Sequence, residues 1–135
     1  MVGILLMTHA PLGQAFIAAC NHVFRGPTER LEAIDVTADQ DLGEVQVLAA
    51  AAIKRLDEGD GVLVITDVKG GTPANCCNRL ADAGRVEVIA GISLPMLLRA
   101  ITYRRDTLDV VVEMALAGAQ SGAVRVDNRI RVGQS

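Results

Sequence analysis

Short apolar runs alternate with amphipathic segments along most of this chain. Two runs, residues 2–7 and 62–65, are uninterrupted, which is typical of strands buried on both faces of a sheet. Residues 31–36 and 86–90 predict two further strands, with 31–36 nearer the edge of the sheet. The segments between them carry apolar residues three and four positions apart, as one face of a helix requires. They predict helices over residues 11–24, 41–56, 72–84, 93–104 and 107–121. The apolar stripe of the first helix comprises Leu12, Ala15, Phe16, Ala19 and Val23.

The alternation of strands and helices favours an α/β fold, a doubly wound and mostly parallel sheet with helices on both faces. We expect the strand order 2-1-3-4, which makes the first and third strands neighbours. Residues 123–126, and also 129–132, alternate apolar residues with arginine, a period of two that predicts a half-exposed strand. We expect this C-terminal strand to be antiparallel and to lie at the sheet edge. The length and the lack of a linker predict a single domain over residues 1–135.

The most informative stretch follows the strand at residues 62–65. Asp67 comes just after this strand, followed by a loop with a Gly70-Gly71 pair and then by Thr72-Pro73. Thr72 is a favourable N-cap and Pro73 suits the first helical position, so a helix begins here. Free N–H groups at a helix start beside glycines can hold a phosphoryl group. A Gly-Gly pair also serves simply as a turn, and this loop has neither Walker nor dinucleotide-binding spacing.

The strand at residues 2–7 leads into Thr8-His9. If both uninterrupted runs are parallel strands of one sheet, their carboxyl ends lie at the same edge, where open α/β sheets bind ligands. His9 would then face Asp67 and the amides of the glycine loop. An imidazole accepts a phosphoryl group when one ring nitrogen is unprotonated, and a carboxylate bonded to the other nitrogen fixes the tautomer. The alternatives are an ordinary loop histidine and an aspartate that only forms a turn.

Three segments resemble the IIA component of the mannose/fructose family of the bacterial phosphoenolpyruvate-dependent sugar phosphotransferase system (PTS). The first is the buried N-terminal strand that ends in Thr8-His9. The second is residues 62–75, an apolar strand followed by Asp-x-x-Gly-Gly-Thr-Pro-x-Asn, and the third is residues 87–97, EVIAGISLPML. The segments occur in the family's order, and the resemblance weakens after about residue 105.

The resemblance implies that His9 is phosphorylated by the carrier protein HPr and passes the phosphoryl group to a IIB partner. It also implies a homodimer in which the C-terminal strand crosses to the partner's sheet. Val68-Lys69 stand where some relatives carry Thr-Trp, a departure that bears on the fit to a partner. The roles of Lys69 and His22 stay open. The family's functional positions fall on catalytic His9 and Asp67, phosphate-binding Gly70, Gly71 and Thr72, and supporting Thr8, Pro73 and Asn75.

Composition narrows the classes of partner. Thirteen Lys and Arg against 16 Asp and Glu give a net charge of −3, which argues against nucleic-acid binding. No apolar run approaches the roughly 18 residues of a membrane span, and residues 2–7 lack the flanks of a signal peptide, so we expect a cytoplasmic protein without membrane insertion. Cys20, Cys76 and Cys77 have no metal-ligand spacing and are interpreted as small buried residues of a reducing compartment. We expect neither a metal nor a cofactor.

Three functions remain open on the sequence alone. The first is a phosphoryl carrier, a protein-histidine phosphotransferase component of the sugar PTS. The second keeps this chemistry but serves dihydroxyacetone kinase, or regulates without a transporter. The third is a non-catalytic anion- or nucleotide-binding module that uses the Gly70-Gly71 loop, with His9 incidental. Sugar specificity is not readable here, because the sugar does not contact this component in the family.

Overall fold

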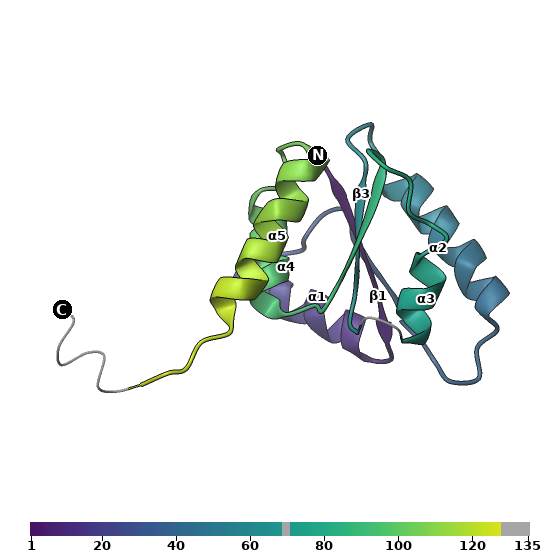
Figure 1. Cartoon of the computed structure of the whole chain (residues 1–135), viewed down its shortest axis with the longest axis horizontal. Coiled ribbons are helices and arrows are strands. Elements are labelled where there is room, and N and C mark those ends of the chain that lie inside the picture. The colour runs from purple at the N-terminus through teal and green to yellow at the C-terminus, as the bar shows by residue number, and fades with distance from the viewer. Residues whose placement is uncertain (69–70, 128–135) are drawn as a thin grey trace.

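The computed structural model describes residues 1–68 and 71–127, and within these ranges four strands form one sheet (Figure 1). All four strands are parallel and lie in the order β2-β1-β3-β4. The predicted order, with the first and third strands adjacent, is therefore confirmed. The strands are β1 (Gly3–His9), β2 (Leu31–Val36), β3 (Val62–Thr66) and β4 (Val86–Ala90).

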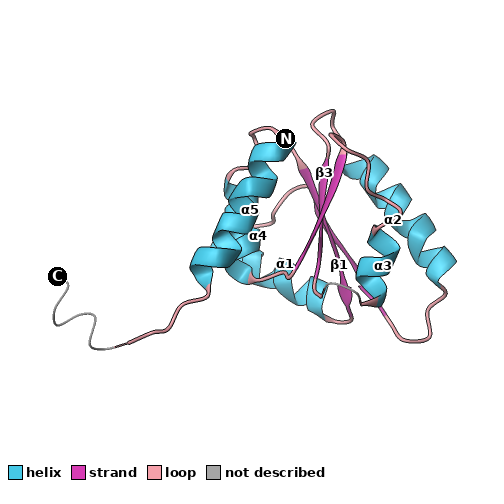
Figure 2. Cartoon of the chain, viewed as in Figure 1, coloured by secondary structure: helices cyan, strands magenta, loops and turns pink. Residues whose placement is uncertain are grey.

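Helices cover both faces of the sheet, as predicted (Figure 2). Helices α1, α4 and α5 pack on one face, and α2 and α3 pack on the other. No helix in the described ranges combines the length and the apolar character that crossing a membrane requires. The helices are α1 (Leu12–Val23), α2 (Leu42–Leu56), α3 (Thr72–Cys77), α4 (Leu94–Thr102) and α5 (Leu108–Gly122).

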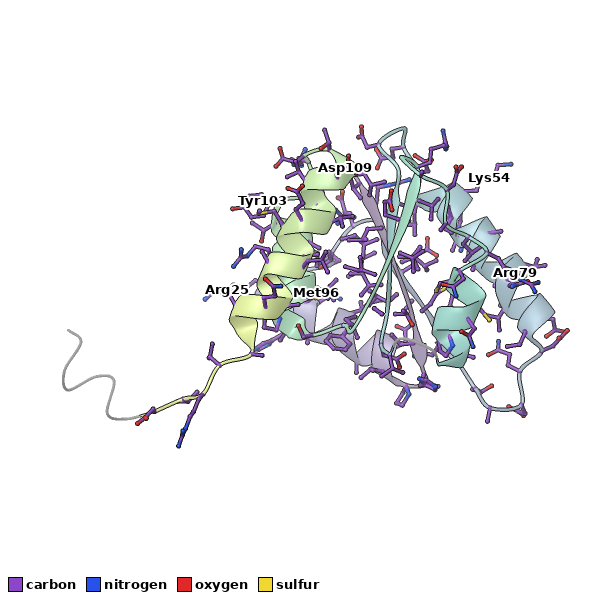
Figure 3. All side chains as sticks on the ribbon, in the orientation of Figure 1. Arg25, Lys54, Arg79, Met96, Tyr103 and Asp109 are labelled. Atoms are coloured by element: carbon purple, nitrogen blue, oxygen red, sulfur yellow. The ribbon has the colours of Figure 1, made fainter. Side chains whose placement is uncertain are left out.

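The pleat of the central strands divides the core into two layers, because successive side chains of a strand point to opposite faces. In β3, Leu63 and Ile65 pack with α1, α4 and α5, whereas Val62 and Val64 pack with α2 and α3. All four side chains are fully buried. Figure 3 shows the two layers as side chains on either side of the sheet, with Met96 of α4 in the first layer. The uninterrupted apolar run is thus explained by burial on both faces.

Arg104 forms hydrogen bonds with the backbone at the start of β1 and just before β2. This buried guanidinium donates hydrogen bonds to the carbonyls of Val2, Glu29 and Arg30, and the Val2 N–H donates to the Arg104 carbonyl at 2.8 Å. Backbone carbonyls that face a buried guanidinium keep their hydrogen bonds without water. The arginine therefore ties the entry into β1 to the entry into β2.

Two of the differences from the predicted element boundaries concern the ends of β1 and α3. Strand β1 extends through His9, because it pairs with β2 as far as the His9–Val36 position. Helix α3 ends at Cys77 and not near residue 84. The Leu80 N–H closes a turn on the Cys77 carbonyl, and residue 82 forms an antiparallel bridge with Val86. The chain has therefore already turned back toward β4 where the sequence indicated a continuing helix.

The predicted apolar stripe of α1 exists but is not the most buried face of the helix. Four of its members, Leu12, Ala15, Phe16 and Ala19, line one hollow together with Leu94 of α4. Helix α1 turns Gly13 and Cys20 to the sheet, with Phe16 and Ile17 partly buried, and leaves Leu12 and Val23 exposed. The reason is steric, because only a residue without a side chain fits where α1 begins. A Cβ at Gly13 would lie 2.6 Å from Asp35 Oδ1 and 2.9 Å from Ala33 Cβ.

The predicted C-terminal edge strand is absent from residues 123–127, and its second part, residues 129–132, lies outside the described residues. Helix α5 ends at Gly122, and the following segment runs away from the sheet in Figure 1. Val124 and Val126 are 70% and 92% exposed. Helix α5 packs beside α4, and the segment that follows it leaves the body of the chain and joins no strand of the described sheet.

Candidate functional site

The carboxyl ends of β1 and β3 bring His9 and Asp67 together, as the sequence predicted. Asp67 Oδ2 lies 2.7 Å from His9 Nδ1 and accepts a second hydrogen bond from the His9 backbone N–H at 2.9 Å. Asp67 Oδ1 accepts from the Val68 N–H at 2.9 Å. The Asp67 side chain is 10% exposed, whereas that of His9 is 54% exposed. The imidazole is therefore held from its buried side and open to solvent on the other.

The protonation of this pair follows from its hydrogen bonds. Burial alone would raise the pKa of the Asp67 carboxyl, but the hydrogen bonds from His9 and Val68, with the charge of His9, outweigh burial and lower it. An ionised carboxylate can only accept hydrogen bonds, so the proton of the 2.7 Å contact belongs to His9 Nδ1. In the neutral imidazole, Nε2 then carries a free electron pair.

Gly71 lies against the imidazole. A Cβ at this position would be 3.3 Å from His9 Cε1 and 3.1 Å from Val68 Cγ2. Its own N–H donates to the Val68 carbonyl at 3.3 Å, so this amide is engaged in a turn and is not free for a ligand. Gly71 thus contributes space beside His9, which corrects the expectation of a free amide at this residue.

The other residues predicted to form or support the phosphate-binding loop are described to different extents. Pro73 is buried in the first turn of α3, and the exposed Asn75 donates its backbone N–H to the Gly71 carbonyl. Thr72 begins α3, as predicted, but its side chain is outside what the structure describes. Gly70 and Lys69 also lie outside the described residues.

Sequence reasoning missed Asp35, which supports the segment that carries His9. This carboxylate, at the end of β2, accepts hydrogen bonds from Thr8 Oγ1 (3.2 Å), Gly13 N (2.8 Å) and Gln14 N (3.3 Å). The supporting role expected of Thr8 thus has a partner in the structure. A signal was present, because Asp35 is the second-last residue of a predicted parallel strand and Asp67 comes just after another, so both lie at the same sheet edge.

A hollow of about 420 Å³ lies beside His9, lined by the loop between β2 and α2. Its wall includes Leu42, which is about half exposed, as is Val68 in the loop after β3. His9 therefore stands between exposed apolar side chains, a surface suited to contact with another protein. The residues that line the hollow are His9, Val36, Thr37, Ala38, Gln40 and Leu42.

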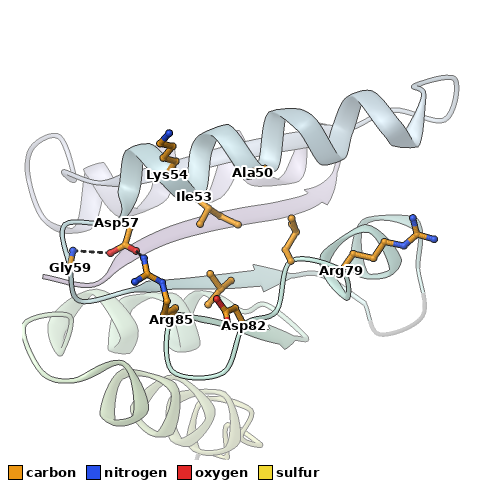
Figure 4. Close-up of a pocket in the computed structure, with 10 residues that line it drawn as sticks. Ala50, Ile53, Lys54, Asp57, Gly59, Arg79, Asp82 and Arg85 are labelled. Atoms are coloured by element: carbon orange, nitrogen blue, oxygen red, sulfur yellow. Dashed lines mark hydrogen bonds and ion pairs between the residues drawn. The ribbon is translucent and has the colours of Figure 1, made fainter.

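A larger hollow, about 550 Å³, lies elsewhere, between α2 and the segment that leads into β4 (Figure 4). Within it Arg85 pairs with Asp57 at 2.7 Å, so an acidic partner already neutralises this cation. Lys54 and Arg79 point away from that pair in Figure 4. Among the described residues that line this hollow, no set of cations converges as binding of an anion or nucleotide would need.

The three cysteines are buried and free, as the sequence indicated for Cys76, Cys77 and Cys20. Burial, with smaller contributions from Cys76 and Asp67, raises the pKa of the Cys77 thiol to about 12. Cys77 lies beneath the site, with its Sγ 3.4 Å from Met7 Sδ, and is a protonated packing residue at neutral pH. Within the described ranges no cluster of His, Cys, Asp and Glu is arranged to hold a metal ion.

The fold and site are those of a doubly wound α/β protein with an exposed, carboxylate-supported histidine at its switch point. Residues 3–116 match the family described as "PTS system fructose IIA component" (EIIA-man). The chain belongs to this family of mannose/fructose-type IIA components of the sugar phosphotransferase system.

Two curated relatives and one solved structure illustrate the likeness. The "PTS system mannose-specific EIIAB component" of Escherichia coli (strain K12) is 27% identical over 124 residues, 90% of this chain but only 38% of that protein. The chain thus spans less than half the length of this relative. The "PTS system fructose-specific EIIA component" of Bacillus subtilis (strain 168) is 27% identical over 105 residues, 77% of this chain and 71% of that protein. The mannose/sorbose-specific IIA subunit from Enterococcus faecalis superposes with a TM-score of 0.80 at 25% identity, covering 93% of this chain and 95% of that one.

The Asp67 carboxylate predicts a pH dependence of stability. Because its pKa is lower in the folded state, the ionised group stabilises the fold above the unfolded-state pKa of about 3.9, and this contribution is lost as the pH falls through the folded-state value. We therefore expect the difference in free energy of unfolding between wild type and Asp67→Asn to be largest at pH 7 and to shrink below about pH 4. Urea unfolding at pH 7, 5 and 3 measures it.

The control is Asp39→Asn, which changes an exposed carboxylate in the loop before α2. Its difference from wild type should stay small across the same range. A wild-type advantage over Asp67→Asn that is equal at pH 7 and pH 3 would show that the charge of Asp67 does not stabilise this fold.

Proposed function

We propose that this chain is a phosphoryl carrier of the sugar PTS, which accepts phosphate from the phosphohistidine of HPr on His9 Nε2 and passes it to a IIB partner. The observation that carries the proposal is the 2.7 Å contact between His9 Nδ1 and Asp67 Oδ2 on an exposed ring. In the neutral imidazole this contact keeps the proton on Nδ1, so that Nε2 carries the free electron pair. Membership in the family of IIA components supports it independently.

The transfer step balances without an external base. The Nε2 electron pair of His9 forms the new N–P bond while the donor's N–P bond breaks, and its electron pair stays on the donor nitrogen. His9 Nδ1 keeps its proton, so the phosphorylated ring carries positive charge next to Asp67 Oδ2. The carboxylate stabilises that charge in the transition state and in the product. The reverse sequence delivers the group to IIB.

In this proposal the loop at residues 70–72 faces the phosphoryl oxygens. Gly71 supports this role through space, since a side chain there would press on His9 Cε1. We assign the hydrogen-bond donors for these oxygens to the hydroxyl and amide of Thr72, the first residue of α3. Pro73 and Asn75 would support this turn, and the Asn75 N–H donates to the Gly71 carbonyl.

Two alternatives to this proposal keep the phosphoryl chemistry but differ in what happens to the phosphoryl group, and a third has no phosphoryl chemistry. A phosphoryl donor to dihydroxyacetone kinase, or a regulatory IIA protein, would use the same His9 and Asp67 chemistry. An anion- or nucleotide-binding module would need convergent donors, and the hollow between α2 and the segment before β4 offers an Arg85–Asp57 pair instead.

The proposal includes a homodimer. β4 forms one end of the described sheet, and the exposed Val124 and Val126 lie on an extended segment that leads away from the body of the chain. Addition of that segment to the edge of a partner's sheet would cover the apolar side chains and satisfy the open edge.

Phosphorylation of His9 is the central prediction. Incubation with phosphoenolpyruvate, Enzyme I and HPr should add one acid-labile phosphoryl group to the wild type, and none to His9→Ala. His22→Ala changes the other histidine, an exposed residue in the last turn of α1, and should be labelled normally.

Asp67→Asn should be labelled about ten- to a thousandfold more slowly, because the amide cannot stabilise the imidazolium charge. Intact-protein mass spectrometry and radiolabelling measure this. A wild type that stays unmodified would favour the binding module.

Gly71→Val should slow transfer about ten- to a hundredfold with little loss of stability, because its Cβ displaces the imidazole or Val68. Stopped-flow or quenched labelling measures the rate, and thermal unfolding measures stability. Gly26→Val is the matched control, since a Cβ at Gly26 meets nothing within 4 Å. Equal transfer rates in both variants would show that the loop does not approach the phosphoryl group.

Truncation after Ser121 tests the dimer. The full chain should be a dimer at micromolar concentration by light scattering, and the truncated chain should be a monomer or aggregate, because it lacks the segment that would cover the sheet edge. A full chain that is monomeric under these conditions contradicts the proposed assembly.

A further inference from the structure

One carboxylate oxygen fastens both ends of the segment that carries His9. Asp35 Oδ1 accepts from Thr8 Oγ1, one residue before His9, and from Gly13 N, four residues after it. Asp35 Oδ2 accepts from Gln14 N in the next position of α1. The segment from Thr8 to Gly13 comprises the end of β1, the turn at residues 10–11 and the start of α1, and its two ends meet at a single side chain.

The residues around the Asp35 carboxylate are closely packed. Thr8 is fully buried, and its Cα pairs with that of Asp35 in the β1–β2 register. At the other end, a Cβ on Gly13 would lie 2.6 Å from Asp35 Oδ1 and 3.0 Å from Thr8 Oγ1. The beginning of α1 is therefore pressed onto the end of β2 in one position.

The backbone between the two ends is also tied to neighbouring strands. The His9 N–H donates to Asp67 Oδ2, and the Ala10 N–H donates to the Val36 carbonyl at 3.1 Å. His9 thus has Asp67 on one side, beyond β3, and the β2 end on the other. Asp67 holds the orientation of the His9 ring, whereas Asp35 holds the backbone segment to which His9 belongs.

We propose that Asp35 is a positioning residue for phosphoryl transfer, which holds the Thr8–Gly13 segment so that His9 Nδ1 stays on Asp67 and Nε2 faces the incoming phosphorus. This inference rests on the proposed phosphoryl-carrier function. Misplacement of a reacting group by about 1 Å can cost about a hundredfold in rate, so loss of this anchor reaches the chemistry without contact with the phosphate.

The test compares Asp35→Asn with Asp57→Asn. Asp57 is a carboxylate of the same kind, since it accepts from the N–H groups of Gly59 (2.8 Å) and Gly61 (3.1 Å) and pairs with Arg85. It lies at the opposite end of the sheet, in the turn that enters β3 (Figure 4). Both substitutions replace an acceptor by a donor beside backbone N–H groups, and both should lower the free energy of unfolding.

The rates separate positioning from stability. With phosphoramidate as a small donor, and separately with phospho-HPr, Asp35→Asn should transfer about ten- to a hundredfold more slowly at saturation, with KM for HPr changed less than threefold. Asp57→Asn should match the wild-type rate. Nitrogen-15 NMR should show that Asp35→Asn mixes the two His9 ring tautomers, whereas Asp57→Asn keeps the proton on Nδ1. Thr8→Val removes only the hydroxyl link and should lie between wild type and Asp35→Asn in all three measurements.

The outcomes distinguish this inference from the proposed function. A wild type that accepts no phosphoryl group from either donor contradicts the proposed function itself. A wild type that is active beside an Asp35→Asn variant with the rates and tautomer of Asp57→Asn overturns the inference. A defect with phospho-HPr but not with phosphoramidate also overturns it, because Asp35 would then act on docking. If Asp35→Asn does not fold, wild-type behaviour of Thr8→Val on all readouts has the same consequence.

Discussion

The structure depends on the direct pairing of β1 with β3. In the order β2-β1-β3-β4, the chain leaves β1 toward β2 on one side and reaches β3 on the other, so that the loops after β1 and β3 diverge. The register aligns Met7 with Thr66, so the next residues of each strand, up to His9 and Asp67, meet just beyond the sheet. The direct pairing of these two parallel strands therefore brings His9 and Asp67, which are far apart in the sequence, to the same edge of the sheet. The contact between the His9 imidazole and the Asp67 carboxylate depends on that register.

The carboxylates at this edge are satisfied by donors from the chain itself. Asp67 accepts from two N–H groups and from His9 Nδ1, and Asp35 accepts from two N–H groups and a hydroxyl. A carboxylate whose electron pairs are engaged in this way repels an approaching phosphoryl group less than a bare one does. Two anionic side chains next to a phosphate acceptor are therefore compatible with its function as proposed.

Much of this could be predicted from the sequence because the relevant signals are local. Uninterrupted apolar runs identified the central strands, and polar residues just after them identified His9 and Asp67 at the ligand-binding edge. Asp35 was not identified because its strand was interpreted as lying near the sheet edge. The rule that the carboxyl ends of parallel strands lie at the ligand-binding edge nevertheless applied to it. The end of α3 and the stripe of α1 depend on tertiary contacts instead. The first reflects a turn closed by Cys77 and Leu80, and the second reflects the close approach of Gly13 to β2.

The C-terminal segment carries a strand signal that the described structure does not express. Its residues alternate valine and arginine, yet residues 123–126 form no strand within the described part of the chain. A period of two specifies which side chains should share a face, but it does not specify which edge supplies the hydrogen bonds. Helix α5 packs along α4, where Gly118 and Gly122 leave no room for a Cβ against Pro95. The segment that follows α5 leads away from the body of the chain in Figure 1. In the homodimer proposed above, the sheet edge of a second molecule would supply the hydrogen bonds that this segment lacks within the described residues.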